Sequence, residues 1–332
     1  MNKILFFLSA VLWWGGTTAQ PLRFDSGGQF RIAQFTDMHL DPSTPRRAAE
    51  AEKTFARLDR VLASEHPDLV VFTGDVVTGA PAEGMWTRLL DTMARRGVPF
   101  CVVLGNHDAE QDLTRQQIAR LVTGSPMSLN TLDDRGELAD RELEIRGSAS
   151  TEPAALVYCL DSHDYSTVEG IEGYGWFTPE QVAWFRASAS ARAEANGGRM
   201  QPALAFFHIV LPEYLPAWRN RANTHIGRAA EDECPGALNT GMFAAMAASG
   251  GLMGTFVGHD HDIDYLVAEK GVAMGYGRYS GDDTTYNNLR PGARILLLGE
   301  GVRGFDTWIV EDDGRTVDRA RFADGKITHL ER

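Results

Sequence analysis

Five apolar stretches of the chain each end in polar side chains that could bind a metal ion or a phosphate group. Histidine, aspartate or asparagine follows each stretch, and five of the nine histidines of the chain lie at these ends. The residues are Asp37 and His39, Asp75, then Asn106, His107 and Asp108, then His208, and finally His259 and His261. Turn formation or a buried histidine could explain any one of these ends, but not all five together.

These side chains offer carboxylate oxygen, imidazole nitrogen and amide oxygen, and no thiolate is among them. Such ligands suit divalent Mn, Fe, Co or Zn rather than a soft metal ion. Two ions about 3.5–4 Å apart need a shared ligand, which one aspartate can provide, and together they clamp both oxygens of a phosphoryl displacement. The residue types therefore predict a site for divalent transition metal ions, and they allow two ions that share one aspartate.

The elements that must position these residues alternate between strand and helix in the first third of the chain. Apolar runs at 30–37, 68–75 and 98–108 have the character of buried strands, and helical spacing is found over 46–65 and 83–97. This βαβαβ order predicts parallel strands covered by helices, hence an α/β fold. Since open parallel sheets bind ligands at the carboxyl ends of their strands, we expect the polar ends to face one site.

The rest of the chain predicts one more long helix and several strands. A polar, loop-rich segment runs from about residue 111 to residue 151, and strands are expected at 154–162, 203–208 and 252–261. Thr178 is expected to cap a helix, with Pro179 at its first position and Gln181 closing a capping box. From Ile263 on, short apolar runs separated by Gly, Asp and Asn predict a second, more antiparallel sheet.

The first nineteen residues have the pattern of a secretory signal peptide. Lys3 precedes an apolar stretch from Ile4 to Trp14, and small residues lead to Ala19. The stretch is short against the roughly 20 residues of a spanning helix, so export is favoured over a membrane anchor. We therefore expect residues 20–332 to form one domain in the periplasm or outside the cell.

The mature chain is acidic, because removal of Lys3 changes its formal charge from −13 to −14. No basic cluster suited to a nucleic-acid backbone is present in the sequence. An anionic substrate would need local positive charge, and a bound metal ion is its most compact source. The composition therefore argues against a nucleic-acid partner.

Three cysteines are present, and their spacing does not match a metal finger. Cys101 lies within an apolar strand pattern and is expected to be a buried thiol. An exported protein could join Cys159 to Cys234, but the count is odd, so at most one disulfide is possible.

The polar ends also form a known series of motifs. These are DMH at 37–39, GD at 74–75, GNHD at 105–108, His208 in FFHIVLPEY, and GHDH at 258–261. In this order they resemble the calcineurin-like metallophosphoesterases, and the resemblance covers residues 37–261. Through VLGNHD, LDSHDYS, GYGWFTPEQ, FHIVLPEY, NTGMF and FVGHDHDIDY the sequence is similar to the purple-acid-phosphatase-29-like branch. The resemblance implies a four-layer α/β/β/α sandwich, with two mixed central β-sheets flanked by helices.

The resemblance further implies a role for each motif residue. One metal ion would be bound by Asp37, His39, Asp75 and His261, and the second by Asp75 again with Asn106, His208 and His259. A hydroxide bridging the two ions would be the nucleophile, since metal binding lowers the pKa of water toward neutrality. At the catalytic centre, His107 would stabilise or protonate the leaving oxygen, and Asp108 would orient the loop.

Residues outside the motifs are candidate substrate contacts. They lie in LDSHDYS, in or near the loop after His208, and in GYGRYSG. They are His163, Glu213, Tyr214, His225, Asn239, Tyr276, Arg278 and Tyr279. A surface or capping role is the alternative for His163, and packing at a strand edge is the alternative for the last three.

Two departures from related patterns narrow the prediction. Purple acid phosphatases carry a tyrosine three residues after the second-motif aspartate, where this chain has Thr78, so a coloured iron–tyrosinate pair is not expected. Protein serine/threonine phosphatases continue with Asp-Arg-Gly after that motif, whereas this chain reads GDVVTGA. The phosphate-binding arginine of those enzymes has no counterpart at that position.

Three classes of function are compatible with these observations. The first is a metal-dependent phosphoesterase acting on a small-molecule phosphoester, with monoesters favoured over diesters. The second is an exported metal-binding protein without turnover, and the third is a carbohydrate- or lipid-binding module that keeps the fold. The complete ligand set argues against the third class, and His107 argues against the second.

Overall fold

The computed structural model describes residues 18–282 and 288–331. The predicted signal peptide lies, apart from residues 18 and 19, outside the described residues. Within these two ranges, no helix combines the length and the apolar character that a membrane crossing requires. The single domain over residues 20–332 stays a prediction.

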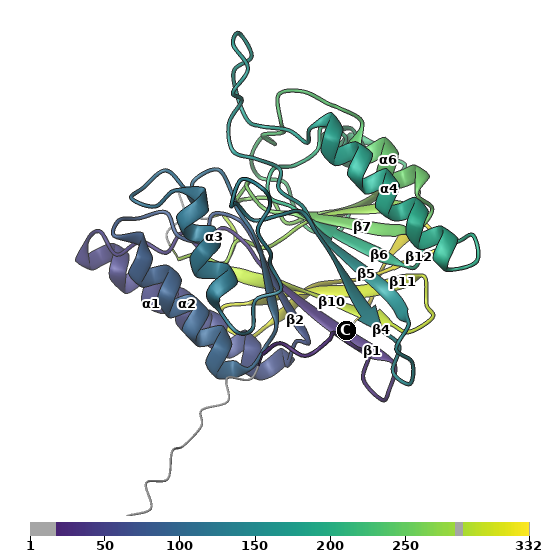
Figure 1. Cartoon of the computed structure of the whole chain (residues 1–332), viewed down its shortest axis with the longest axis horizontal. Helices are drawn as coiled ribbons and strands as arrows, with labels where there is room; N and C mark the ends of the chain where they lie inside the picture. Colours follow the sequence, from purple (N-terminus) through teal and green to yellow (C-terminus); the bar gives the residue numbers. More distant parts are fainter. Residues whose placement is uncertain (1–17, 283–287, 332) are drawn as a thin grey trace, which may run out of the picture.

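Two mixed β-sheets form the centre of the molecule (Figure 1). The first sheet contains, in spatial order, β13 (Lys326–His329), β12 (Thr316–Ala323), β11 (Gly304–Glu311), β10 (Gly292–Gly299), β1 (Gln29–Phe35), β2 (Leu69–Thr73) and β3 (Phe100–Val103). The second contains β4 (Arg141–Arg146), β5 (Pro153–Cys159), β6 (Ala203–Phe206), β7 (Leu252–Val257), β9 (Val272–Tyr276) and β8 (Leu266–Glu269). Strands β1, β2 and β3 are parallel to one another, as are β5, β6, β7 and β9.

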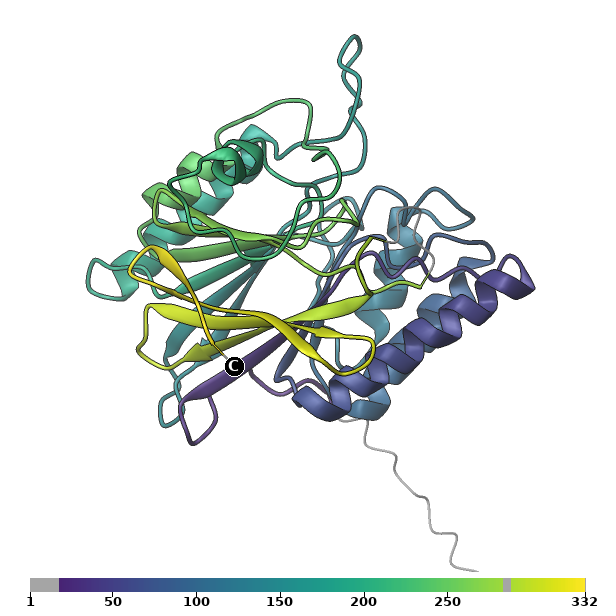
Figure 2. The same cartoon turned by 180° about the vertical axis from the view of Figure 1, so that it is seen from behind.

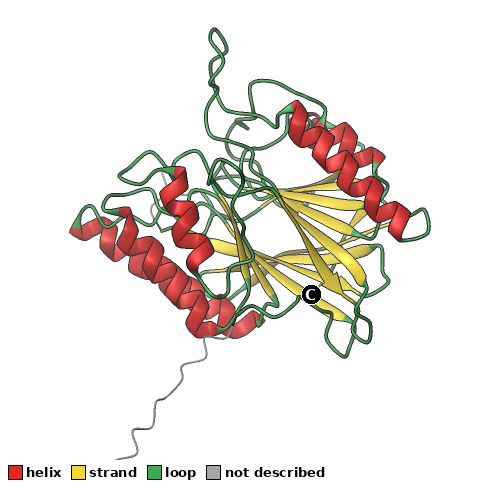
Figure 3. Cartoon of the chain, viewed as in Figure 1, coloured by secondary structure: helices red, strands yellow, loops and turns green. Residues whose placement is uncertain are grey.

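Helices cover the outer faces of both sheets (Figure 3). The first sheet is covered by α1 (Pro45–Glu65), α2 (Ala82–Arg96) and α3 (Arg115–Gly124). The second sheet is covered by α4 (Pro179–Ala195), α5 (Tyr214–Arg219) and α6 (Met242–Ala248). The molecule is therefore the expected four-layer α/β/β/α sandwich.

Three apolar clusters hold the four layers together, one at each interface between neighbouring layers. Strand β2 contributes side chains to two of these apolar clusters. Val70 and Phe72 pack against the helices, whereas Leu69 and Val71 pack between the sheets, because successive side chains of a strand point to opposite faces. A strand buried on both faces reads as a continuous apolar run, which is the pattern that the sequence shows.

The sequence prediction was wrong about where the C-terminal strands lie. They pair mostly antiparallel, as expected, but β10 to β13 extend the first sheet instead of forming a second one. The connection is the antiparallel pair of β1 and β10, in which Gln29 lies opposite Gly299; Figure 2 shows the yellow C-terminal strands beside the purple β1. Of the described strands that follow Ile263, β8 and β9 join the second sheet.

Two local predictions have different outcomes. The helix after Thr178 is confirmed, and the side chains of Thr178 and Gln181 each accept a hydrogen bond from the other's backbone N–H. The segment 111–151 holds more regular structure than predicted, since it contains α3 and β4. Helix α3 buries only Ile118, Ala119 and Val122, which is too short an apolar face to give a clear periodic signal.

Candidate metal centre

The candidate metal ligands lie just after the carboxyl ends of five strands, three in the first sheet and two in the second. Asp37 and His39 follow β1, Asp75 follows β2, Asn106 follows β3, His208 follows β6, and His259 and His261 follow β7. The two sheets are joined close to these ends, because the side-chain amide of Gln34 donates to the carbonyl of Val257 at 3.0 Å. The parallel strands of both sheets thus deliver their ends to one place.

The ligand atoms form two groups that share Asp75. Asp37, His39, Asp75 and His261 make the first group, and Asp75, His208 and His259 make the second, with all atoms of a group within 4.8 Å of one another. Asn106 adjoins the second group, since its Oδ1 lies 3.1 Å from Nε2 of His208. We call these seven residues the metal cluster; the structure brings together every ligand expected from the sequence.

The backbone of the metal cluster is strained. Asp37, His39, Asp75 and His259 have positive φ angles of 51°, 44°, 49° and 78°. Residues with a side chain rarely adopt this conformation, which costs on the order of 1–3 kcal/mol each and persists only where the surroundings enforce it. Such strain is typical of functional sites.

Two motif glycines leave room for these ligands. A Cβ atom on Gly105 would overlap the Asp75 carboxylate and lie 2.7 Å from Nε2 of His208. Gly74 has a φ of 87°, and a Cβ there would overlap the His208 ring. The glycines before Asp75 and Asn106 are therefore required by the close approach of the ligands.

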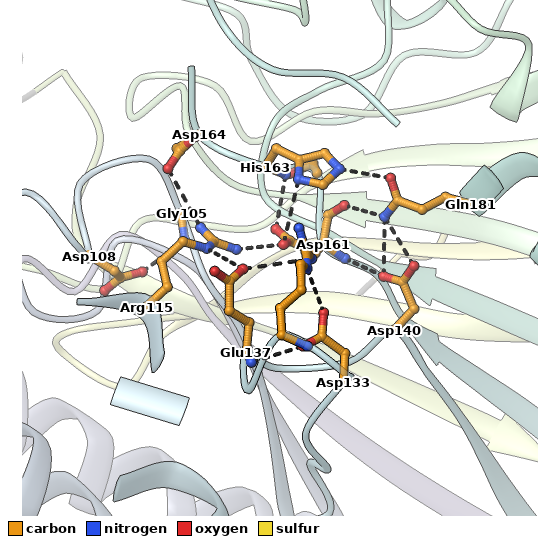
Figure 4. Close-up of polar contacts among 12 residues, drawn as sticks. Gly105, Asp108, Arg115, Asp133, Glu137, Asp140, Asp161, His163, Asp164 and Gln181 are labelled. Atoms are coloured by element: carbon orange, nitrogen blue, oxygen red, sulfur yellow. Dashed lines mark hydrogen bonds and ion pairs between the residues drawn. The ribbon is translucent and has the colours of Figure 1, made fainter. Parts of the chain in front are cut away.

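Asp108 is buried and organises the loops around the cluster. Its carboxylate accepts backbone N–H groups of Asp75 at 3.0 Å, Val76 at 2.8 Å, Val77 at 3.1 Å and Gly105 at 2.8 Å, the last drawn in Figure 4. Burial, together with the negative charge of Asp75, raises the pKa of Asp108 to about 6. These contacts agree with the expected loop-orienting role of Asp108, and its part in catalysis stays a prediction.

A hydrogen bond to the backbone orients the imidazole ring of His208. Its Nδ1–H donates to the carbonyl of Thr73 at 2.7 Å, which turns Nε2 toward the Asp75 carboxylate at 3.4 Å. Burial opposes the charged form, but the charge of Asp75 and the hydrogen bond to it raise the pKa of His208 to about 10. The negative charge that favours a proton at Nε2 also favours a metal cation there.

The donor set of the cluster fits divalent transition metal ions. The Nε2 atoms of His39 and His259 are buried and have no hydrogen-bond partner among the residues that the structure describes. Burial, with the charge of His261, lowers the pKa of His39 to about 4; burial, with the charge of His208, lowers that of His259 to about 3. Both rings are therefore neutral at neutral pH and can offer a lone pair, as metal-binding imidazoles must.

Position 78 differs from the purple acid phosphatase pattern in a way that the structure makes concrete. The hydroxyl of Thr78 lies 3.4 Å from Nδ1 of His39. Thr78 therefore contacts the Nδ1 side of a candidate ligand, and a threonine has no phenolate group that could bind a metal ion.

His107 lies at the rim of the cluster. Its backbone N–H donates to Oδ1 of Asp75 at 2.9 Å, and its side chain is 40% exposed. Nδ1 lies 2.5 Å from Oε2 of Glu110, and the ring centre is 6.2 Å from that of His39. An exposed imidazole this close to the ligands can reach a substrate bound at the cluster.

Sequence reasoning assigned no role to four residues that lie near the metal cluster. They are Glu110, Tyr165, Tyr174 and Asp260. Asp260 accepts the hydroxyl of Tyr276 at 2.7 Å and so fixes the loop between His259 and His261. Both tyrosines belong to the LDSHDYS and GYGWFTPEQ stretches, so the resemblance pointed at them without giving them a role.

Three tyrosine contacts expected with substrate are wrong, because the side chains are buried and hydrogen-bonded within the protein. The Tyr214 hydroxyl donates to the Thr255 carbonyl at 3.0 Å, and Tyr276 donates to Asp260. The Tyr279 hydroxyl donates to the carbonyl of Leu289 at 2.6 Å. The first two pack in the cluster that covers the second sheet.

Arg278 is likewise not available to a phosphate group. It is 2% exposed, and its guanidinium pairs with Asp264 at 2.5 Å and with Glu311 at 3.2 Å. Strand β9 ends at the same edge as β7, but Arg278 points into the protein. Two buried carboxylates already neutralise its charge.

The remaining substrate candidates lie outside the metal cluster. Nε2 of His163 contacts the Gln181 side chain at 2.9 Å within the polar network of Figure 4. Asn239 donates to Glu213 at 2.7 Å, and the His225 ring packs on Trp218 at 4.7 Å. A substrate contact by any of these four residues stays a prediction.

The three cysteines are free. The considered bridge between Cys159 and Cys234 is not formed, because Cys159 lies between the sheets beside Cys101. Burial, together with the neighbouring Cys101, raises the pKa of the Cys159 thiol. The expected buried thiol at Cys101 is confirmed.

A four-layer sandwich with two ligand groups sharing one aspartate at the strand ends defines the class of two-metal phosphoesterases. The sequence model of the Calcineurin-like phosphoesterase family matches residues 30–262. The chain belongs to this family, and it is a phosphoric ester hydrolase of the metallophosphoesterase type.

Relatives and solved structures agree with this assignment. Probable inactive purple acid phosphatase 29 of Arabidopsis thaliana is 32% identical over 78% of this chain and 74% of its own length. Phosphatase DCR2 of Saccharomyces cerevisiae is 32% identical over 76% of this chain, which spans 47% of that protein. A dimetal phosphatase from Danio rerio superposes with a TM-score of 0.60 at 15% identity, covering 89% of this chain and 99% of the other, and so shares the fold.

Proposed function

We propose that the chain is a phosphomonoesterase whose metal cluster binds two divalent transition metal ions, either Mn, Fe, Zn or Co. Asp37, His39, Asp75 and His261 would hold one ion, and Asp75, Asn106, His208 and His259 the other. The observation that carries this proposal is the sharing of buried Asp75 between the two ligand groups. A bridging carboxylate is what two ions at close distance require.

When bound, two such ions supply Lewis acidity and a water molecule activated for attack near neutral pH. Asp75 belongs to both groups, and Asp108 accepts the backbone N–H groups of residues 75–77 and of Gly105, which fixes the two loops relative to each other. Glu110 occupies Nδ1 of His107, which leaves Nε2 to donate a proton to the leaving oxygen of the ester. His107 would thus provide an acid on the solvent-exposed side of the buried metal cluster.

The preference for monoesters is supported by the names of two relatives, an acid phosphatase and a phosphatase. A phosphodiesterase using the same cluster is the alternative. The word "inactive" in the plant relative's name motivates a third candidate, a metal-binding protein without turnover. Against it stand the complete ligand set and the exposed His107.

We also propose that the protein is exported. The support is the signal-like pattern of residues 1–19, with its short apolar stretch. Mass determination of the protein recovered from the secreting cell should show cleavage after Ala19. A chain that retains Lys3 in the cytosol would contradict export.

Reconstitution with single metals tests the catalytic proposal. The full chain should be stripped with a chelator, loaded with Mn, Fe, Co or Zn, and assayed on p-nitrophenyl phosphate and bis(p-nitrophenyl) phosphate. We expect metal-dependent hydrolysis that is faster on the monoester. Faster hydrolysis of the diester would favour the phosphodiesterase, and no hydrolysis with full metal occupancy would favour the protein without turnover.

A further inference from the structure

Residues 163–176 form a narrow loop that projects beyond the body of the molecule (Figures 1 and 2). The base of this loop contacts the metal cluster. Its base is ordered like a short hairpin, in which Tyr165 pairs antiparallel with Tyr174. Ser166 N–H donates to the Gly173 carbonyl at 2.9 Å, and Gly175 N–H donates to the Asp164 carbonyl at 3.0 Å. This pairing stacks the rings of Tyr165 and Tyr174 at 5.6 Å with an interplanar angle of 25°.

The stacked pair is fixed to the metal cluster at both ends. The Tyr174 ring meets the His259 ring edge to face at 4.3 Å. At the other end, the Tyr165 hydroxyl accepts from the side-chain amide of Asn106 at 3.1 Å and donates to Oε1 of Glu110 at 2.8 Å. The two tyrosines therefore span two members of the metal cluster and contact the carboxylate that holds His107.

The ring of Tyr165 is nevertheless open to solvent. The residue is 39% exposed although its hydroxyl is fully engaged by two partners, so the ring presents apolar surface. An aromatic ring that is already held in one orientation loses little conformational entropy when a ligand stacks on it. Such a ring beside a polar centre is suited to fix the planar part of a ligand.

We infer that Tyr165 and Tyr174 form an aromatic wall that binds the organic group of the phosphoester, so that aryl or heteroaryl monoesters are preferred over alkyl monoesters. The inference rests on the proposed function, because the phosphate group must be held by the metal cluster. With His107 donating to the leaving oxygen, the group attached to that oxygen lies on the side of Glu110 and Tyr165. The wall then selects the leaving group by stacking.

Binding of non-hydrolysable analogues tests the wall without turnover. Calorimetry on the metal-loaded full chain should compare phenylphosphonate, methylphosphonate and inorganic phosphate. We expect phenylphosphonate to bind about threefold to tenfold tighter than methylphosphonate, the range that an aromatic stack provides. Tyr165→Leu and Tyr174→Leu should each reduce this ratio, which compares two ligands on the same variant and is therefore independent of any common change in affinity for the phosphate part.

Two further variants separate the ring from other effects. Tyr165→Phe removes the hydrogen bonds to Asn106 and Glu110 but keeps the ring, so it should keep the ratio. Trp184→Leu removes another exposed aromatic residue, which packs on Tyr158 at 6.1 Å and lies on helix α4, and it should change nothing. Thermal melting should show all four variants folded, because the altered side chains are exposed or lie in a surface loop.

The outcomes distinguish this inference from the function on which it rests. A wild-type chain that binds both phosphonates equally, or a Tyr165→Leu variant with an unchanged ratio, would overturn the wall and leave the phosphomonoesterase intact. A metal-loaded wild-type chain that neither binds phosphate nor hydrolyses an ester would remove the proposed function and the wall together.

Discussion

Two buried clusters of charged side chains lie near the carboxyl ends of the strands, and they are built in opposite ways. The first is the metal cluster; the second, here called the arginine cluster, consists of Asp264, Arg278, Arg294 and Glu311. In the arginine cluster, Arg278 pairs with both carboxylates, and Arg294 donates to the carbonyls of Tyr276 at 2.7 Å and Asp264 at 2.6 Å. The buried positive and negative charges of the arginine cluster therefore neutralise one another.

The metal cluster differs from the arginine cluster in its hydrogen bonding and in its backbone conformation. Two of its imidazole nitrogens lack a hydrogen-bond partner within the described ranges, and four of its residues have strained backbone. Burial of charge therefore does not by itself mark a functional site, because the arginine cluster is equally buried and closed. Incomplete hydrogen bonding and backbone strain together distinguish the candidate functional site from the cluster that stabilises the fold.

The largest expected effect comes from Asp75→Asn in the metal cluster. The variant removes the shared negative charge, while the asparagine Oδ1 can still accept the His107 N–H, so the fold should be kept. We expect the rate of phosphoester hydrolysis to fall roughly 10³-fold or more, with weaker binding of at least one ion. Steady-state kinetics and elemental analysis would measure both.

A surface carboxylate serves as the matched control for Asp75→Asn. Asp306 pairs with Arg321 on the first sheet, far along the chain from the cluster, and Asp306→Asn should leave the rate unchanged. A metal-loaded Asp75→Asn protein with the wild-type rate would contradict the assignment of the metal cluster.

The second effect concerns His107, which lies beside the metal cluster without belonging to it. His107→Ala should retain both ions but hydrolyse about 10²- to 10⁴-fold more slowly, the usual contribution of a positioned proton donor. The deficit should be smaller for p-nitrophenyl phosphate than for an alkyl phosphate, because p-nitrophenolate leaves without protonation. Equal rates of the variant and the wild type on both esters would exclude His107 from the mechanism.

The arginine cluster should respond in the opposite way. Arg278→Met leaves Asp264 buried without its partner, so we expect the free energy of unfolding to fall by about 3–5 kcal/mol. The rate per folded molecule should stay near that of the wild type. Urea unfolding and active-site-normalised kinetics would measure the two quantities.

Arg321→Met provides the comparison at the surface. Its ion pair with Asp306 is exposed, so the loss should be within about 1 kcal/mol. If Arg278→Met instead abolished hydrolysis while the unfolding transition stayed in place, Arg278 would regain the phosphate-binding role that the structure denies it.

How far the sequence could predict the site follows from this contrast. The polar strand ends were found because they follow apolar runs, and parallel strands bring their carboxyl ends together whatever loops connect them. The choice of seven ligands among these residues came from the family resemblance. The substrate contacts proposed in GYGRYSG failed for Arg278 and Tyr276, although this stretch lies at the carboxyl end of β9. The position of a residue along a strand does not reveal that its side chain pairs with a buried carboxylate, as Arg278 does with Asp264 and Tyr276 with Asp260.

The parts of the fold that were not predicted also depend on contacts between distant segments. β10 and β1 pair across most of the chain, and neither sequence carries a signal for the other. The four backbone bonds of Asp108 and the stacking of Tyr165 on Tyr174 appear only after the loops have been folded. Local patterns give the strands, whereas side-chain pairing between loops needs the structure.

The smallest expected effect is that of Tyr214→Phe, and it tests the boundary between the two kinds of site. The ring is buried 5.6 Å from that of Tyr276, and the hydroxyl donates to the Thr255 carbonyl, so its loss should cost about 0.5–1.5 kcal/mol of unfolding free energy. Neither kcat nor KM should change, because the phenylalanine ring keeps the packing on Tyr276 and the lost hydroxyl bonds Thr255, which is not part of the metal cluster. A raised KM with an unchanged unfolding free energy would show that the loop after His208 opens during catalysis, and that this closed region takes part in substrate binding.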